Sequence, residues 1–308
     1  MVVKIVTDST SDLPSQLAQD LGITIVPAYV HFGDQTYRDG VDISGDELYR
    51  RLVDGPVYPT TSASSPGDFA EAYNRLSQET DSIVSIVVTA KLSAMYSSAL
   101  LGKETLQGKC RVEVVDSKSL TMGLGLIAMA AAEKARDGGT IEEVLEVTRQ
   151  AVSTTHMLAC LDTLKYVLKG GRLAKVSGLL GAMGSVIRVK PVITLQDGDL
   201  VPAGVVRTRV SALDRLHEFV KRRLPVEEVA VVHNTTPQEA ESLASRIKSL
   251  IPGKPSLISR VGPGLGVHAG PGALVVALRK SREEPEEPAH EERKRLKLSL
   301  PSLRAHRP

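Results

Sequence analysis

The sequence predicts an α/β protein in which a largely parallel sheet covered by helices is followed by a second, α+β domain. Short Val- and Ile-rich runs alternate with segments of helical period through the first half of the 308-residue chain. This alternation is typical of strand–helix–strand units, and hairpin signals join it in the second half. Hydrophobic residues make up 42% of the chain but aromatic residues only 3%, so Val, Leu, Ile and Ala must form most of the core.

Residues 1–154 predict an N-terminal α/β domain. Its expected strands are residues 4–7, 23–30, 82–88 and 111–115. Its expected helices are residues 13–20, 45–53, 68–79, 95–107 and 120–137. The third of these helices has a clear start, because Ser65 can cap it, Pro66 suits the first helical position and Asp68 suits the first turn. Asp137-Gly138-Gly139-Thr140 ends the last of them and begins a further helix.

Residues 155–280 predict a C-terminal α/β domain with a mixed sheet. Its expected strands are residues 156–161, 186–195, 200–207, 229–233, 256–261 and 273–279. Its expected helices are residues 162–168, 211–224 and 237–250, and residues 178–185 form a small-residue segment. Gln196-Asp197-Gly198-Asp199 is a favourable hairpin turn, so the second and third strands should pair with each other.

The charge distribution does not predict a basic patch for nucleic acid or anionic lipid. The net charge is +2, and residues 280–308 account for it with eight Lys or Arg and six Glu. The rest of the chain is therefore balanced, and the absence of Trp leaves few rings for base stacking. Residues 281–308 lack an apolar period, so we expect a disordered, charged tail.

Several features predict a cytoplasmic protein without membrane insertion. The chain starts directly on a strand pattern, without the plan of a signal peptide. The longest apolar run, residues 124–132, is far too short to cross a bilayer. Cys110 and Cys160 lie far apart in apolar settings and are expected to be buried free thiols. No His, Cys or carboxylate cluster has the spacing of a metal site, so we expect no metal.

Hydroxyl-rich segments follow four of the expected strands or precede helices beside them. They are residues 8–12, 60–65, 89–93 and 116–119. Helix capping explains any single Ser or Thr among them. Four such segments at the edge of one sheet where ligands usually bind instead favour a site for a small anion, a carboxylate or a phosphate.

Four further motifs are less decisive. The glycine-rich residues 262–272 contain His268, for which the residues alone leave structural and functional roles equally open. Two loose dinucleotide fingerprints, beginning at Gly123 and Gly264, lack the required context: the first lies inside an expected helix and the second leads into an expected strand. Ser93, His268 and Asp116 suggest a triad, but no Gly-x-Ser-x-Gly elbow surrounds Ser93.

The motifs, taken in order, resemble those of the DegV family over residues 4–279. They are Asp8-Ser9-Thr10-Ser11-Asp12-Leu13, Pro59-Thr60-Thr61-Ser62, Ser65-Pro66-Gly67-Asp68-Phe69, Val115-Asp116-Ser117, Tyr166-Val167-Leu168-Lys169-Gly170-Gly171-Arg172, Val189-Lys190-Pro191-Val192 and His268-Ala269-Gly270-Pro271-Gly272. One loop departs from the family, which commonly has Leu-Ser-Gly-Thr-Tyr where this chain has Leu92-Ser93-Ala94-Met95-Tyr96.

The resemblance implies a two-domain DegV-like fold that holds a long-chain, palmitate-like fatty acid, with the C-terminal domain completing the lipid site. It also implies a non-catalytic carrier, the acyl-carrying subunit of a bacterial fatty acid kinase that phosphorylates the bound carboxylate, and no other cofactor. The carboxylate contacts implied are Thr61, Ser62, Ser93 and His268. Arg172 and Arg207 follow family motifs and are either contacts with the kinase or its phosphate, or surface ion pairs.

Three functions remain open at this point: a fatty-acid carrier, an acyl hydrolase or transferase that uses Ser93, and a binder of another small anion. A sixteen-carbon acyl chain would bury about 14 methylenes, worth on the order of 11 kcal/mol before the entropy of association is subtracted. The tunnel would therefore supply the affinity, and the hydroxyls would make the buried carboxylate tolerable.

Overall fold

The computed structural model describes residues 2–106, 108–169, 189–254 and 256–281. Its first sheet has four parallel strands in the order β2-β1-β6-β7, with Ile5 opposite both Ile23 and Val84. The strands are β2 (Ile23–Val26), β1 (Lys4–Asp8), β6 (Ser82–Val87) and β7 (Arg111–Asp116). This sheet confirms the predicted α/β class.

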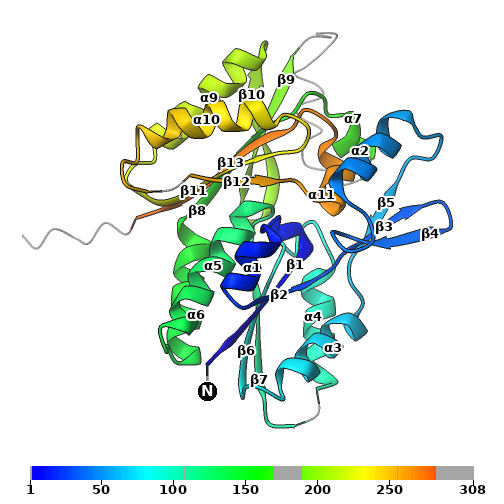
Figure 1. Ribbon diagram of the computed structural model, residues 1–308, viewed down its shortest axis with the longest axis vertical. Coiled ribbons are helices and arrows are strands. Elements are labelled where there is room, and N and C mark those ends of the chain that lie inside the picture. The colour runs from blue at the N-terminus through cyan, green and yellow to red at the C-terminus, as the bar shows by residue number, and fades with distance from the viewer. Residues whose placement is uncertain (1, 107, 170–188, 255, 282–308) are drawn as a thin grey trace, which may run out of the picture.

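Helices cover both faces of the parallel sheet (Figure 1). One pair is α3 (Pro66–Leu76) and α4 (Met95–Glu104), and the other is α5 (Met122–Arg136) and α6 (Ile141–Thr154). Their starts follow the sequence signals, since Ser65 and Thr140 each form a complete capping box. The short helix α1 (Ser15–Asp20) precedes β2, and η1 (Ser9–Ser11) directly follows β1.

The second sheet is mixed, as predicted, with the order β10-β9-β8-β13-β11-β12. Its strands are β8 (Thr155–Cys160), β9 (Lys190–Gln196), β10 (Asp199–Val206), β11 (Val226–His233), β12 (Ser256–Arg260) and β13 (Leu274–Lys280). Only β11 and β12 pair in parallel. On one face of this sheet lie α9 (Arg209–Lys221) and α10 (Pro237–Lys248), and α5 packs against β13.

A small third sheet was not predicted. It contains β3 (Tyr29–Phe32), β4 (Gln35–Arg38) and β5 (Thr60–Ser62). The helix α2 (Gly45–Asp54) lies between β4 and β5 in the chain. The expected single strand 23–30 is instead β2 and β3, which separate at Pro27 because proline has no N–H for the ladder. The carbonyl of Pro27 accepts the Ser64 hydroxyl (2.8 Å), and the Ala28 N–H donates to Ser9 Oγ (3.0 Å).

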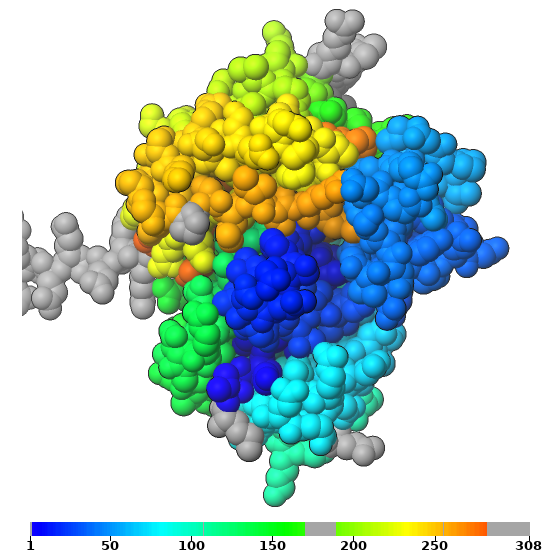
Figure 2. Space-filling model, in the orientation of Figure 1, coloured from blue at the N-terminus to red at the C-terminus, as the bar shows by residue number. Residues whose placement is uncertain are grey.

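The glycine-rich segment after β12 also corrects the sequence interpretation. Residues from Gly264 were expected to run into a strand, but they form the short helix α11 (Pro263–Ala269), which ends at Gly270 with φ of +67°. A Cβ at Gly266 would lie 2.6 Å from Leu48 Cδ2 of α2, so glycine is needed here for close helix packing. Figures 1 and 2 show α2, in blue, against the orange surface of this region. A second short helix, α7 (Lys165–Lys169), also contacts α11.

One hydrophobic core connects the two large sheets. Val6 and Ile86 of the parallel sheet belong to the same buried cluster as Ala159 and Val275 of the mixed sheet. The expected division at residues 154 and 155 lies between α6 and β8, within this shared core. Among the described residues, no helix is long and apolar enough to cross a membrane.

Both cysteines are free thiols, as expected, but only one is fully buried. Cys160 is buried, and burial raises the pKa of its thiol to about 12, whereas Cys110 is half-buried. Five predicted features lie wholly or partly outside the described residues: the last residue of the helix 95–107, Arg172, the segment 178–185, the start of the strand 186–195 and the charged tail.

Candidate functional site

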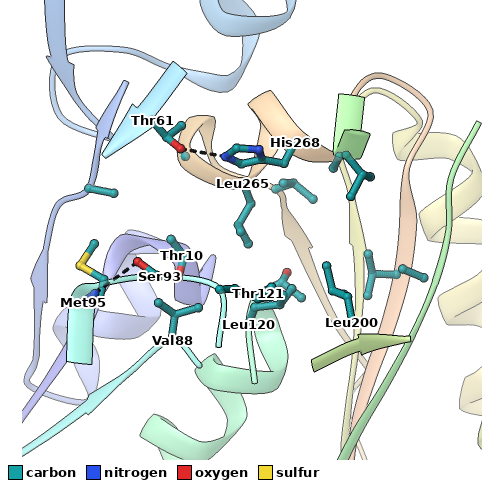
Figure 3. A pocket seen from close by; sticks show the side chains of 18 of the residues that line it. Thr10, Thr61, Val88, Ser93, Met95, Leu120, Thr121, Leu200, Leu265 and His268 are labelled. Carbon is teal, nitrogen blue, oxygen red and sulfur yellow. Dashed lines mark hydrogen bonds between the residues drawn. The ribbon is translucent and has the colours of Figure 1, made fainter. Parts of the chain in front are cut away.

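An apolar pocket lies between the two large sheets. Its empty space, counted together with the part that is open to solvent, is about 950 Å³. Both halves of the chain supply aliphatic walls: Val88, Leu92, Met95, Leu120, Met157, Leu161, Val167, Ile193, Leu200, Val261, Leu265 and Val275. Val88 and Leu120 follow strands of the parallel sheet, and Leu200 belongs to the hairpin of the mixed sheet (Figure 3).

Thr61 and His268 form the polar edge of this pocket on one side. Thr61 Oγ1 lies 2.8 Å from His268 Nε2, a contact between β5 and the last turn of α11. Both side chains are half-buried and point toward the pocket in Figure 3. Two residues 207 positions apart in the sequence are thus brought together at one end of an aliphatic space.

Ser93 lies on the other side of the pocket, beside Thr10 (Figure 3). Its Oγ accepts the N–H of Met95 (3.3 Å) at the start of α4, where the helix dipole favours negative charge. The hydroxyls of Thr10 and Thr121 also line the pocket, but they donate to Asp8 (2.5 Å) and Asp12 (2.6 Å). Ser93, in contrast, keeps its own proton for a group in the pocket.

Ser62 borders the pocket, but its hydroxyl is held elsewhere. Ser62 Oγ lies 2.9 Å from His31 Nε2, and the other ring nitrogen of His31 lies 2.9 Å from Thr36 Oγ1. Because side chains alternate along a strand, Ser62 faces away from the side on which Thr61 meets His268. The structure therefore brings Thr61, Ser93 and His268 to one pocket and places Ser62 behind Thr61.

The suspected triad of Ser93, His268 and Asp116 is not assembled. His268 Nε2 pairs with Thr61, and Asp116 Oδ1 accepts the backbone N–H groups of Ala90 (3.2 Å) and Lys118 (2.9 Å). Within the described part of the chain, no group of three His, Cys, Asp or Glu side chains is arranged to hold a metal ion.

Buried carboxylates fix the position of α11. Asp12 Oδ1 accepts the N–H of Gly262 (2.8 Å), and Asp39 accepts the Ser9 hydroxyl (2.7 Å) and the N–H of Gly264. Burial raises the pKa of Asp39 to about 6 and raises the pKa of Asp12 well above its ordinary value. No local sequence pattern marks Asp39, because an isolated Asp before Gly40 is an ordinary loop pattern.

The β9–β10 hairpin closes over the pocket and is tied to the parallel sheet. Thr89, at the end of β6, donates its hydroxyl to the carbonyl of Gly198 in the hairpin turn (3.0 Å). Lys118 Nζ lies 3.6 Å from the carboxylate of Asp197 in the same turn. These contacts hold Ile193 and Leu200 in the pocket wall, so the predicted turn at residues 196–199 has a second role.

Comparison with known proteins identifies the family. A family model described as "Uncharacterised protein, DegV family" matches residues 2–281. The chain belongs to the DegV family. A DegV domain-containing protein of Streptomyces coelicolor is 38% identical over 282 residues, which cover 90% of this chain and 98% of that protein.

Solved structures of similar proteins share the fold described above. One from Thermus thermophilus, described as fatty acid binding of a DegV family protein, has a TM-score of 0.81 and 30% identity, covering 91% of this chain and 100% of the other. Another from Eubacterium ventriosum, described as a stearic acid-binding protein, has a TM-score of 0.81 and 28% identity, covering 90% and 98%.

Two DegV features noted in the sequence have different outcomes in the structure. The departure from the family loop puts Met95 in the pocket wall, where it is buried and its Sδ accepts the N–H of Ser64 (3.4 Å). Arg207 is exposed after β10, outside the pocket, and Arg172 lies outside the described residues. The expectation that these arginines contact a partner remains a prediction.

Proposed function

We propose that this DegV protein binds one long-chain fatty acid, with the acyl chain in the apolar pocket and the carboxylate between Thr61, Ser93 and His268. The observation that carries the proposal is an aliphatic pocket that Thr61 and His268 border on one side and Ser93 on the other. The DegV relatives described as fatty acid or stearic acid binders support the same ligand class.

The acyl chain and the carboxylate of the fatty acid contribute differently to the binding free energy. Burial of about 14 methylenes is worth on the order of 11 kcal/mol before the entropy of association, so the walls supply most of the affinity. A buried carboxylate without partners would oppose binding strongly. Ser93 can donate its hydroxyl proton while it accepts from Met95. The Thr61 hydroxyl, paired with His268 Nε2 (2.8 Å), is the second proposed contact of the carboxylate.

Under this proposal Ser62 supports the site indirectly. Its contact with His31 fixes the end of β5, and so helps to hold Thr61 in place. We therefore assign the direct head-group contacts to Thr61, Ser93 and His268, and a supporting role to Ser62.

The structure favours a carrier over the two alternatives. An acyl hydrolase or transferase would need a base beside Ser93, but the Ser93 hydroxyl accepts the backbone N–H of Met95, and His268 pairs with Thr61. A binder of another small, polar anion would not need walls made largely of Leu, Ile, Val and Met. We assign this carrier to the cytoplasm, as the sequence predicts.

Mass spectrometry of lipid extracted from the purified chain tests the ligand. We expect intact long-chain fatty acid at about one molecule per chain, and no hydrolysis of acyl esters. Ester hydrolysis that disappears in Ser93→Ala would instead identify an enzyme. A delipidated chain that takes up no fatty acid would contradict the proposed function altogether.

We further propose that the carrier presents its fatty acid to a fatty acid kinase through Arg172 and Arg207. Reversing both charges (R172E/R207E) is expected to lower kinase-dependent phosphorylation of the bound fatty acid at least about tenfold, because steering and docking of partners depend on such charges. Fatty-acid binding should not change. Equal phosphorylation by this variant and by the control R75E/R136E, which alters two exposed arginines on α3 and α5, would contradict the assignment.

A further inference from the structure

A second hollow lies beside α9 on the mixed sheet, and its described lining includes three arginines and one lysine. Its empty space is about 990 Å³ and opens to solvent. Arg215 and Arg222 come from α9 or its end, Arg223 from the turn that follows, and Lys280 from the end of β13. His156 of β8 completes the ring of basic side chains. Glu218 is the carboxylate among the described lining residues.

The positive charges of this basic hollow are poorly compensated. The Glu218 carboxylate is bonded to Arg222 Nε (2.8 Å). Arg215 donates to the carbonyl of Ala203 (3.3 Å), and Arg223 donates to the carbonyl of Phe219 (3.2 Å), so both have neutral partners. None of the described salt bridges involves Arg215, Arg223 or Lys280. Three cations therefore face the hollow without a carboxylate.

Helix capping does not explain the cluster. Cations at the end of α9 interact favourably with its dipole, which accounts for Lys221, Arg222 and Arg223. It does not account for Arg215, well before the helix end, or for Lys280 and His156, which come from two strands of the sheet. Side chains from separate elements therefore converge on one space.

Burial and repulsion among these cations lower the pKa of two of the groups, Arg223 and His156. Burial, and then the neighbouring Arg215 and Arg222, lower the pKa of Arg223. Burial, and then Arg223 and Lys280, lower the pKa of His156. An anion in the hollow would relieve both repulsions. Guanidinium groups also present paired N–H donors that match the oxygens of phosphate.

We propose that the basic hollow is a second binding site, separate from the acyl pocket, for a small phosphorylated anion. A phosphate carries about two negative charges at neutral pH and so matches three uncompensated cations better than a single carboxylate does. The site is polar and open, and its lining residues are different from those of the acyl pocket.

Calorimetric titration of the full chain with inorganic pyrophosphate at low ionic strength tests this site. We expect saturable binding that weakens at least about tenfold in R215Q/K280Q, because two charge-assisted contacts are lost. The control K221Q/R75Q removes the same charge from exposed residues that do not line the hollow and should change binding less than about twofold. Ala203→Glu, which adds a carboxylate beside Arg215, should also weaken binding.

The acidic run at residues 283–287 is attached three positions after Lys280 and is a competing anion in the sequence. The titration is therefore repeated with Glu283, Glu284, Glu286 and Glu287 changed to Gln. The proposal is supported if the unaltered chain or the chain with the four Gln substitutions binds pyrophosphate, and if R215Q/K280Q abolishes this binding while the control keeps it. Fatty-acid retention should be unchanged in every variant. Absence of saturable binding in both chains, or equal losses in variant and control, would overturn it.

Discussion

Replacing Thr61 with Val and Ser93 with Ala in the same chain is expected to weaken fatty-acid binding at least about 100-fold. Each hydroxyl removed is a donor to a carboxylate, and hydrogen bonds to charged groups contribute about 1.5–3 kcal/mol each. Two lost together therefore amount to about 3–6 kcal/mol. The aliphatic walls remain, because Thr61→Val keeps the shape of the side chain and Ser93→Ala removes one atom.

The measurement is the dissociation constant for a delipidated chain, determined for palmitate and for its methyl ester. Palmitate should lose affinity in the double variant, while the uncharged ester should bind as it does to the unaltered chain. The matched control is T60V/S97A, which removes the same groups from exposed positions next to Thr61 and within α4. Equal affinity of the double variant and the control for palmitate would show that the carboxylate lies elsewhere.

Much of the fold followed from local signals in the sequence. Ser65 and Thr140 formed the capping boxes that their spacing predicts, and Asp197-Gly198 formed the predicted hairpin turn between β9 and β10. The errors arose where tertiary packing decided the conformation. Residues from Gly264 became a helix because their glycines allow close contact with Leu48 and Tyr49 of α2, which no local pattern reveals. β5 has only three residues and exists because it pairs with β3.

The candidate site was predicted in part. Hydroxyl-rich segments at the ends of parallel strands were expected to meet at one edge, and Thr10, Thr61 and Ser93 do line one pocket. The resemblance to DegV proteins, and not the spacing, drew attention to Thr61 and His268 together. The facing direction of Ser62 depends on the register of β3 and β5, so the sequence alone did not separate it from Thr61. The role of Asp39 depends on burial, which is set by the whole fold.

Asp39 gives a second large expected effect, this time on stability. Its pKa is about 6 in the folded protein, raised from 3.8 chiefly by burial, so the folded protein binds a proton more tightly than the unfolded chain. This stabilising proton is fully bound below the unfolded pKa and is lost as the pH rises through 6. Between pH 8 and pH 5 the contribution is about 1.4 kcal/mol in favour of the folded state at the lower pH.

Asp39→Asn should remove this pH-dependent contribution, because the amide stays neutral and its oxygen can still accept the Ser9 hydroxyl. Urea unfolding at pH 5 and pH 8 measures the change in free energy of unfolding for each chain, and contributions from other titrating groups largely cancel in the difference. Asp34→Asn, at an exposed loop position between β3 and β4, removes the same charge and should follow the unaltered chain. If Asp39→Asn shows the same pH dependence as that control, the Asp39 carboxyl does not carry the proton.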